Sequence, residues 1–373
     1  MKEKGKNKFF GIVKKEPVLI ISAICAIISM FFVPPSAAYM GYIDWKVLAL
    51  LFCLMAVVAG FSQCGLFDVM GQKLLKRCSG TRTLRFVLIM LPFFTSMLIT
   101  NDVALITFVP FAISVLCAVN RERDLIPVIV FQTVAANLGS MATPVGNPQS
   151  LFLYNSFSIP AAQYFFTIAP FAAVSLIALA GASVLCRNEP IAVSFGSDAK
   201  LKSPWRMVIF SLLFVLSMLC VLHIIDYRPV LAAVVIALLI FDRPIFAKID
   251  YGLLVTFVCF FIFSGNLGNI PSVRSTLAAL LEKSTMLTSA IASQAISNVP
   301  AAVLLAGFTD DWRGLLIGTN IGGLGTIIAS LASLISFKYY AKCDSAKPIK
   351  YIAVFTLVNV IGLATLIGLA YIL

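Results

Sequence analysis

Histidine and charged residues are scarce in this 373-residue chain. There is one histidine, His223, and acidic and basic residues together make up 12% of the sequence. The nine cysteines are scattered without the paired spacing of zinc ligands or of a disulfide framework. A catalytic triad, a histidine-based metal centre and a zinc site are therefore not expected. We predict that the protein is not an enzyme and that it needs no cofactor other than a coupling ion.

Long hydrophilic runs are also missing, because the longest such stretch extends only from Arg187 to Ser203. Hydrophobic residues account for 60% of the chain, and several runs reach the roughly 20 apolar residues that cross a bilayer. The first apolar run, Val18 to Val33, is followed by Pro34-Pro35 and not by a small-residue cleavage site, which favours a retained helix over a cleaved signal peptide. This composition predicts an all-α polytopic membrane protein.

The net charge of +12 comes from basic residues that gather in the segments expected on the cytoplasmic face, so it does not indicate a nucleic-acid partner. Six lysines precede the first helix, which places the N-terminus in the cytoplasm by the positive-inside rule. Further basic clusters lie at 73–85, 121–123, 187–206, 243–248 and 338–350. The basic residues left for the outer face are Lys46, Arg228, Arg274, Lys283 and Arg313. With these assignments the C-terminus lies outside.

The apolar run from Phe86 to Val119 is too long for one crossing helix. As a single helix it would measure about 51 Å, against a hydrocarbon core of about 30 Å. Because basic residues flank both ends, we predict a re-entrant hairpin at 86–119 with its tip at Thr100, Asn101 and Asp102. A second hairpin is predicted at 275–307, with Ser297 and Asn298 at its tip.

Two polar stretches interrupt apolar segments in corresponding places. Residues 137–151 read NLGSMATPVGNPQSL, and residues 320–334, NIGGLGTIIASLASL, align with them without a gap. Glycine and proline interrupt helices, and such backbone is tolerated at membrane depth where it is buried in protein or lines a cavity. Paired, interrupted segments in two halves of a chain indicate the binding site of a transporter.

These features divide the chain into two repeats of opposite orientation. We predict an N-terminal segment with the first helix at 1–44, one repeat at 45–186, a cytoplasmic linker at 187–204 and a second repeat at 205–373. The broken helices are expected at 126–157 and 313–340. Unbroken crossing helices are expected at 17–33, 45–64, 160–186, 205–224, 229–242, 250–268 and 350–372.

The expected chemistry comes from backbone dipoles, amides and hydroxyls. Half-helix N-termini attract anions, whereas carbonyl, amide and hydroxyl oxygens suit a hard cation such as sodium. The predicted substrate-binding residues are Asn101, Asp102, Asn137, Asn147, Asn298, Asn320 and Thr326. The predicted cation-binding residues are Thr100, Asn101, Gly146, Ser297, Asn298 and Ala329.

The tips ITND and ISNV resemble the Ser-Asn-Thr motifs of the divalent anion/sodium symporters. The stretch ANLGSMATPVGNP is similar to their broken-helix loop, and NIGGLGTIIAS is similar to its repeat. The chain thus resembles the ion transporter superfamily, which also holds arsenite permeases, citrate–metal symporters and sodium/proton antiporters. Its short length and PVGNPQ loop resemble the compact anion permeases of that group most. The resemblance implies an elevator-type secondary transporter, commonly a homodimer.

The tips also depart from the symporter pattern, because Asp102 and Val299 stand where the symporters have threonine. Asp102 can be an ion-path residue or the cap of the second hairpin limb. Our hypothesis is a transporter in the cytoplasmic (inner) membrane for a small anion, an organic di- or tricarboxylate or an inorganic oxyanion, coupled to sodium or protons. A sodium/proton antiporter that uses Asp102 and an arsenite efflux permease are the alternatives.

Overall fold

The computed structural model describes residues 17–76, 78–185, 187–191 and 199–373, and this part of the chain is almost entirely helical. The six lysines that precede the first helix, and part of the predicted linker, lie outside these residues. Seven of the described helices are long and apolar enough to cross a membrane. They are α4 (Trp45–Gln63), α6 (Thr81–Ile99), α7 (Asn101–Ala118), α10 (Ala161–Val184), α11 (Pro204–Val221), α13 (Tyr251–Gly268) and α19 (Pro348–Ile372). The predicted class, a polytopic helical membrane protein, is confirmed.

Shorter helices complete the described chain. Those of the first half are α2 (Pro17–Phe32), α3 (Tyr39–Tyr42), α5 (Leu66–Leu75), α8 (Leu125–Ser140) and α9 (Pro148–Ser156). Those of the second half are α12 (Tyr227–Phe241), α14 (Pro271–Lys283), α15 (Thr285–Ile296), α16 (Asn298–Leu305), α17 (Trp312–Ile321) and α18 (Leu331–Tyr340). Short 3₁₀ turns lie at Glu122–Asp124, Arg243–Lys248 and Ala306–Phe308.

The first hairpin turns at Thr100, between α6 and α7. Thr100 has a positive φ of 70°, a conformation that is uncommon outside glycine. The following interruption runs from Met141 to Asn147, because residues 137–140 remain helical at the end of α8. Asn147 ends the break by accepting a hydrogen bond from the Ser150 amide, and Pro148 occupies the first position of α9.

The second half has the same order of structure with different lengths. α15 and α16 meet at Ser297, which has a φ of 75°. The limb before this tip begins at Thr285, not near residue 275 as predicted, because the Ser284 side chain caps a new helix there. Residues 271–283 instead form the separate helix α14. The second break runs over 322–330, inside the polar stretch 320–334 that the alignment indicated.

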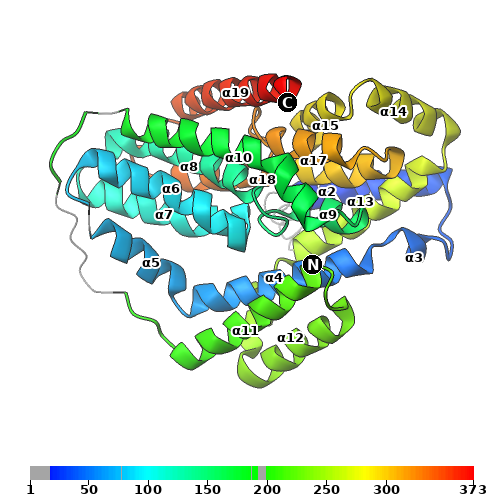
Figure 1. The fold of residues 1–373 in the computed structure, drawn as a ribbon, viewed down its shortest axis with the longest axis horizontal. Coiled ribbons are helices and arrows are strands. Elements are labelled where there is room, and N and C mark those ends of the chain that lie inside the picture. Colours follow the sequence, from blue (N-terminus) through cyan, green and yellow to red (C-terminus); the bar gives the residue numbers. More distant parts are fainter. Residues whose placement is uncertain (1–16, 77, 186, 192–198) are drawn as a thin grey trace, which may run out of the picture.

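The two hairpins lie in different halves of the molecule, and the broken helices join them. Figure 1 shows α6, α7, α8 and α10 on the left and α14, α15 and α17 on the right. α9 packs against α16 and α17 of the second half, whereas α18 packs against α7 and α8 of the first. α4 runs below both groups and packs against α11 and α12, and α19 contacts both α8 and α17. Each broken helix therefore spans both halves.

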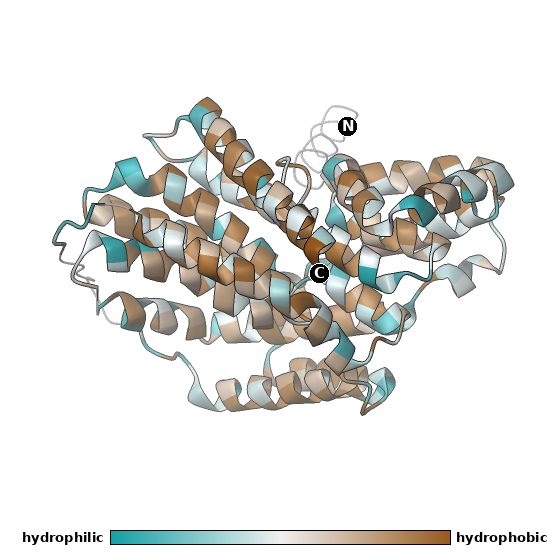
Figure 2. Cartoon of the chain, turned by 45° about the horizontal axis from the view of Figure 1, so that its top comes forward, coloured by the Kyte–Doolittle hydropathy of each residue, from teal (hydrophilic) through white to brown (hydrophobic). Residues whose placement is uncertain are grey.

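The outer helices present apolar side chains. Only 22% of the apolar window of α10 and 17% of that of α19 is buried within the chain. Phe166 is 81% exposed and Ile349 is 87% exposed. Figure 2 shows hydrophobic residues along the helices and hydrophilic residues mainly in the segments that connect them. These faces match a protein whose surroundings are lipid.

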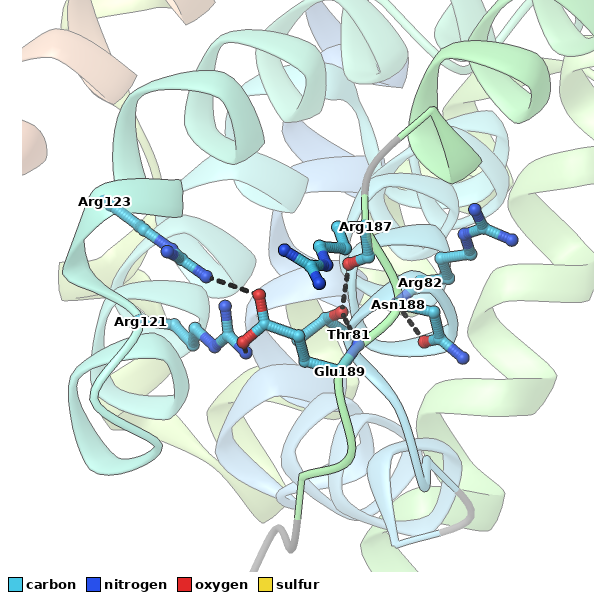
Figure 3. A network of polar contacts seen from close by, with 7 residues as sticks. All are labelled: Thr81, Arg82, Arg121, Arg123, Arg187, Asn188 and Glu189. Carbon is cyan, nitrogen blue, oxygen red and sulfur yellow. Dashed lines mark hydrogen bonds and ion pairs between the residues drawn. The ribbon is translucent and has the colours of Figure 1, made fainter.

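The linker residues that follow α10 bind both ends of the first hairpin (Figure 3). The Glu189 carboxylate pairs with Arg121 and, at 2.9 Å, with Arg123, in the turn between α7 and α8. The Thr81 hydroxyl, at the start of α6, donates to the Arg187 carbonyl at 2.9 Å and accepts from the Glu189 amide at 3.0 Å. The two ends of the α6–α7 hairpin therefore lie side by side.

Candidate functional site

Both hairpin tips bind the break that follows them through backbone hydrogen bonds. The Asn101 amide donates to the Gly146 carbonyl at 3.0 Å, and the Asn298 amide donates to the Ala329 carbonyl at 2.9 Å. Residues Gly146 and Ala329 occupy the same place in the gapless alignment of the two breaks. Each tip is thus held at the level where its neighbouring helix is interrupted.

Side-chain amides then connect the two breaks to each other. The Asn147 amide donates to the Asn320 side-chain oxygen at 2.9 Å, and the Ser330 hydroxyl donates to the Asn137 side-chain oxygen at 3.1 Å. The Asn137 side-chain oxygen also accepts a hydrogen bond from the side-chain amide of Asn101 at 3.0 Å. The structure therefore brings four predicted substrate residues, Asn101, Asn137, Asn147 and Asn320, into one buried polar centre.

These two bonds are equivalent under the alignment of the breaks. Asn147 corresponds to Ser330, and Asn320 corresponds to Asn137, with 183 positions between the members of each pair. The alignment contained the signal for Ser330, which the prediction missed because a serine replaces the asparagine. A third pair of bonds joins two corresponding threonines of the breaks to the carbonyl three residues before each tip.

In this pair, the Thr143 hydroxyl donates to the Met97 carbonyl, and the Thr326 hydroxyl donates to the Gln294 carbonyl at 3.1 Å. Thr326 is exposed, and its hydroxyl is bonded to the hairpin limb. Its assignment to the substrate stays a prediction.

The hairpins can approach the broken helices because glycine lies at the contact. A Cβ atom on Gly139 would lie 2.2 Å from the carbonyl oxygen of Phe93, and one on Gly322 would lie 2.8 Å from the Cα atom of Ala290. Both distances are shorter than real Cβ contacts. This close packing fixes the position of each hairpin tip along the broken helix beside it.

Two residues that the sequence did not single out hold the irregular backbone. The Tyr164 hydroxyl of α10 contacts the carbonyls of Met141 and Thr143, at 2.8 and 3.1 Å, in the first break. The Gln294 amide donates to the carbonyls of Gly322 and Leu324 in the second, at 2.8 and 2.9 Å. These bonds satisfy polar groups that would otherwise be costly to bury.

Asp102 lies beside the polar centre and faces different neighbours. It lines a cavity of about 270 Å³ together with Asp250, Thr256 and Lys338. A smaller cavity of about 80 Å³ places it next to Thr100 and Asn147. Within the described part of the chain, the Asp102 carboxylate has no hydrogen bond to the four amides. Its own amide donates to the Asn101 side-chain oxygen at 3.0 Å.

The predicted cation ligands already accept hydrogen bonds. Gly146 and Ala329 accept from the tip amides, the Ser297 hydroxyl donates to Ala329 at 3.4 Å, and the Asn298 side-chain oxygen accepts from the Val299 amide at 2.9 Å. The Gly146 carbonyl accepts one of these bonds and keeps a second lone pair that can contact a cation, whereas the Ala329 carbonyl already accepts two.

The Asn137 side-chain nitrogen, in contrast, is a buried donor with no partner among the described residues. A buried donor without an acceptor is unfavourable by about 1–3 kcal/mol. An acceptor oxygen of a bound solute would remove this cost. The polar centre therefore combines oxygens for a cation with a donor for an oxygen-bearing substrate.

A helical membrane protein with a buried polar centre at two helix breaks has the architecture of a membrane transporter. Residues 9–310 match the family model described as citrate transporter, and the chain belongs to this family. This places the chain in the ion transporter superfamily, as its motifs predicted. The family and the names of its relatives identify a transporter and not an enzyme.

Several curated proteins are similar over long or short stretches. An uncharacterized transporter of Methanocaldococcus jannaschii is 32% identical over 297 residues, which cover 79% of this chain and 81% of the relative. The inner membrane protein YbiR of Escherichia coli is 30% identical over 315 residues, 83% of each chain. The silicon efflux transporter LSI3 of Oryza sativa is 34% identical over 115 residues, 31% of this chain and 23% of that protein.

Proposed function

We propose that the protein is a secondary active transporter that moves a small anion across the cytoplasmic (inner) membrane, coupled to sodium or protons. The observation that carries this proposal is the reciprocal pair of bonds, Asn147 to Asn320 and Ser330 to Asn137. They join two interrupted helices at one buried point, the arrangement that secondary transporters use for substrate and coupling ions. The substrate belongs to the organic di- or tricarboxylates or the inorganic oxyanions.

The helix ends at this point support an anionic substrate. α7, α9, α16 and α18 all begin at the tips or breaks, next to Asn101, Asn147, Asn298 and Ser330. The N-terminus of a helix carries a partial positive charge and N–H donors. Four such ends, together with the donor of Asn137, suit the oxygens of an anion. A bound sodium ion would add positive charge.

The equivalent contacts made in the two halves of the chain support an elevator mechanism with inverted repeats. In this mechanism the hairpins and broken helices, α6–α9 and α15–α18, move as one body. α4, α11 and α12, which pack against one another, remain as the scaffold. The further parts of the proposal are a homodimer, a cytoplasmic N-terminus and an external C-terminus.

A sodium/proton antiporter is the second candidate, and the surroundings of Asp102 favour it. Asp102 and Asp250 line one cavity with Lys338 and a smaller one with Asn147, so two carboxylates lie close to the polar centre. Ionisable residues within membrane segments commonly mark ion paths. In this alternative Asp102 binds sodium and protons in turn.

The test is uptake by purified protein in sealed vesicles under a sodium gradient or a proton gradient, applied separately. The probes are labelled citrate, succinate, sulfate and arsenite, with wild type compared to Asp102→Asn. A symporter takes up a probe under one of the gradients. The N-cap residue of α7 is Thr100 and not Asp102, and no side chain caps this helix. If Asp102 only supplies negative charge to the first turn of α7, Asp102→Asn keeps gradient-driven uptake. If Asp102 carries protons, Asp102→Asn exchanges substrate without pH dependence. If the rate of uptake by the wild type is the same with and without each gradient, coupled transport is excluded.

A further inference from the structure

A cavity of about 290 Å³ lies between α8, α10 and α19, apart from the polar centre. Its walls include Phe131 and Leu138 of α8, Ala178 and Ala182 of α10, and Gly362 and Thr365 of α19. The space is open at the outer surface of these helices, so the medium around the protein can enter it.

The chemistry of the walls excludes a polar occupant. Two lining residues carry hydroxyls, and each donates to its own helix: Ser175 to the Phe171 carbonyl at 2.6 Å and Thr365 to the Ile361 carbonyl at 2.8 Å. The other walls are apolar. Water enters a cavity when it finds two to four polar partners, which these walls do not offer. An anion would find no donor.

The cavity is continuous with the surface that faces lipid. Ile361 lines it and is 57% exposed, and Ile177, next to Ala178 of the wall, is 72% exposed. α10 and α19 are also the helices with the smallest buried share among the seven membrane-crossing candidates. In a bilayer, the fluid next to this opening is hydrocarbon.

We propose that this cavity is a binding site for one acyl chain of a bilayer phospholipid. A hydrocarbon chain in the cavity makes dispersion contacts with the wall atoms, which have no such contacts when the cavity is empty. The chain enters between α10 and α19, while its headgroup remains at the membrane surface. The site binds an acyl chain through its shape and its apolar walls, and it does not select among headgroups.

The position of the site connects it to both helix breaks. Leu138 of the wall directly follows Asn137 of the polar centre. Gly362 lies against the second break, because a Cβ atom added there would be 3.1 Å from the Leu324 side chain. An acyl chain in the cavity thus supports α8 and α19 where they adjoin the two breaks. We expect its binding to slow amide exchange at 322–330.

The test compares a variant that fills the cavity with a matched variant on the adjacent surface. Ala178→Trp places an indole in the cavity, whereas Ile177→Trp places it on the lipid-facing side of the same helix. Delipidated full-length protein in detergent is titrated with dioleoylphosphatidylcholine. Retained lipids are counted by native mass spectrometry, and amide exchange is measured at 322–330.

We expect wild type and Ile177→Trp to retain one phospholipid more than Ala178→Trp. Added lipid should slow exchange at 322–330 in the first two proteins and leave it unchanged in the third. Equal retention and equal exchange responses in all three proteins would overturn the proposal. If Ala178→Trp does not fold, Ala182→Leu adds a smaller side chain to the same wall and is judged by the same two measurements.

Discussion

The side chains of Asn147 and Asn320, 173 positions apart, meet through a hydrogen bond of 2.9 Å between the amide of the first and the oxygen of the second. Asn147 precedes α9, and Asn320 lies near the end of α17. The bond therefore joins the start of one half-helix to the end of another from the opposite half of the chain. With Ser330 and Asn137, it makes the buried centre a shared product of both halves.

The first prediction concerns the energy of this contact. Asn147→Ala and Asn320→Ala should be non-additive in thermal unfolding, with a coupling energy of about 0.5–3 kcal/mol, because they share a buried hydrogen bond. Each single change should also destabilise the protein by itself. Asn147→Ala removes the cap on the Ser150 amide, and Asn320→Ala removes bonds to the Ser150 hydroxyl and the Leu316 carbonyl.

The control for this cycle is Asn359→Ala. Asn359 is fully buried, and its amide donates to the Phe355 carbonyl of its own helix. It should destabilise the protein without coupling to Asn320→Ala. Additive effects of the Asn147 and Asn320 changes would show that the contact does not form in the membrane-extracted protein.

The second prediction uses two glycines in neighbouring helices. Gly139→Ala should destabilise the protein by about 1–3 kcal/mol, the usual range for overpacking, because its Cβ atom would lie 2.2 Å from the Phe93 carbonyl oxygen. Gly181→Ala in α10 has no atom within 4 Å of the new Cβ. It should be neutral or stabilising by up to about 1 kcal/mol, since alanine favours helix more than glycine does. The check is to measure the unfolding midpoints of both variants in the same detergent. Equal losses would contradict close packing of α8 against α6.

Much of this arrangement could be predicted because the interruptions leave local marks in the sequence. Each tip turns at the residue before an asparagine, Thr100 or Ser297, as the polar breaks in the apolar runs indicated. The order of hairpin, broken helix and later helices likewise follows from apolar run lengths. The gapless alignment also predicted which residues would be equivalent, and the contacts of Gly146 and Ala329 agree with it.

The remaining features depend on contacts that no local pattern records. The exchange of α9 and α18 between the two halves joins segments far apart in sequence, so apolar periodicity cannot show it. α5 was missed because it is short and amphipathic, and α14 because its polar residues were assigned to a hairpin limb. Gln294 looks like an ordinary polar residue in a helix, yet its side chain binds three backbone groups of a break.

The third prediction concerns the docking of the linker on the hairpin. Hydrogen bonding from Arg121, and then from Arg123, holds the pKa of Glu189 below its usual range. A carboxylate with a lowered pKa stabilises the folded state above its unfolded pKa of about 4.3, and this contribution is lost as pH falls through the lower folded value. We therefore expect the Ile191 amide, which donates to the Ser79 carbonyl at 3.1 Å, to stay protected at neutral pH and to lose protection in acid.

Hydrogen exchange of the Ile191 amide, corrected for its intrinsic pH dependence, measures this effect. Glu189→Gln should lower the protection at neutral pH and remove the acid step. Glu282→Gln, which changes an exposed carboxylate of α14, should leave both unchanged. An acid step that persists in Glu189→Gln would assign the docking to other groups.

The fourth prediction concerns orientation in the membrane, which the proposed inverted repeats require. Arg85 is poorly suited to labelling because it is 9% exposed, but Arg82 and Arg123 are both exposed, at opposite ends of the first hairpin. In a background without native cysteines, Arg82→Cys and Arg123→Cys should react with a membrane-impermeant maleimide only after the cytoplasmic face is opened. Lys283→Cys, in the last turn of α14, should react from outside in intact cells, because Lys283 is one of the basic residues assigned to the outer face. Since Glu189 links Arg123 to the segment that binds Thr81, the first two positions must share a face.

Labelling of Lys283→Cys from the same face as Arg82→Cys would show that the two hairpins have one orientation, and the inverted repeat would then be wrong.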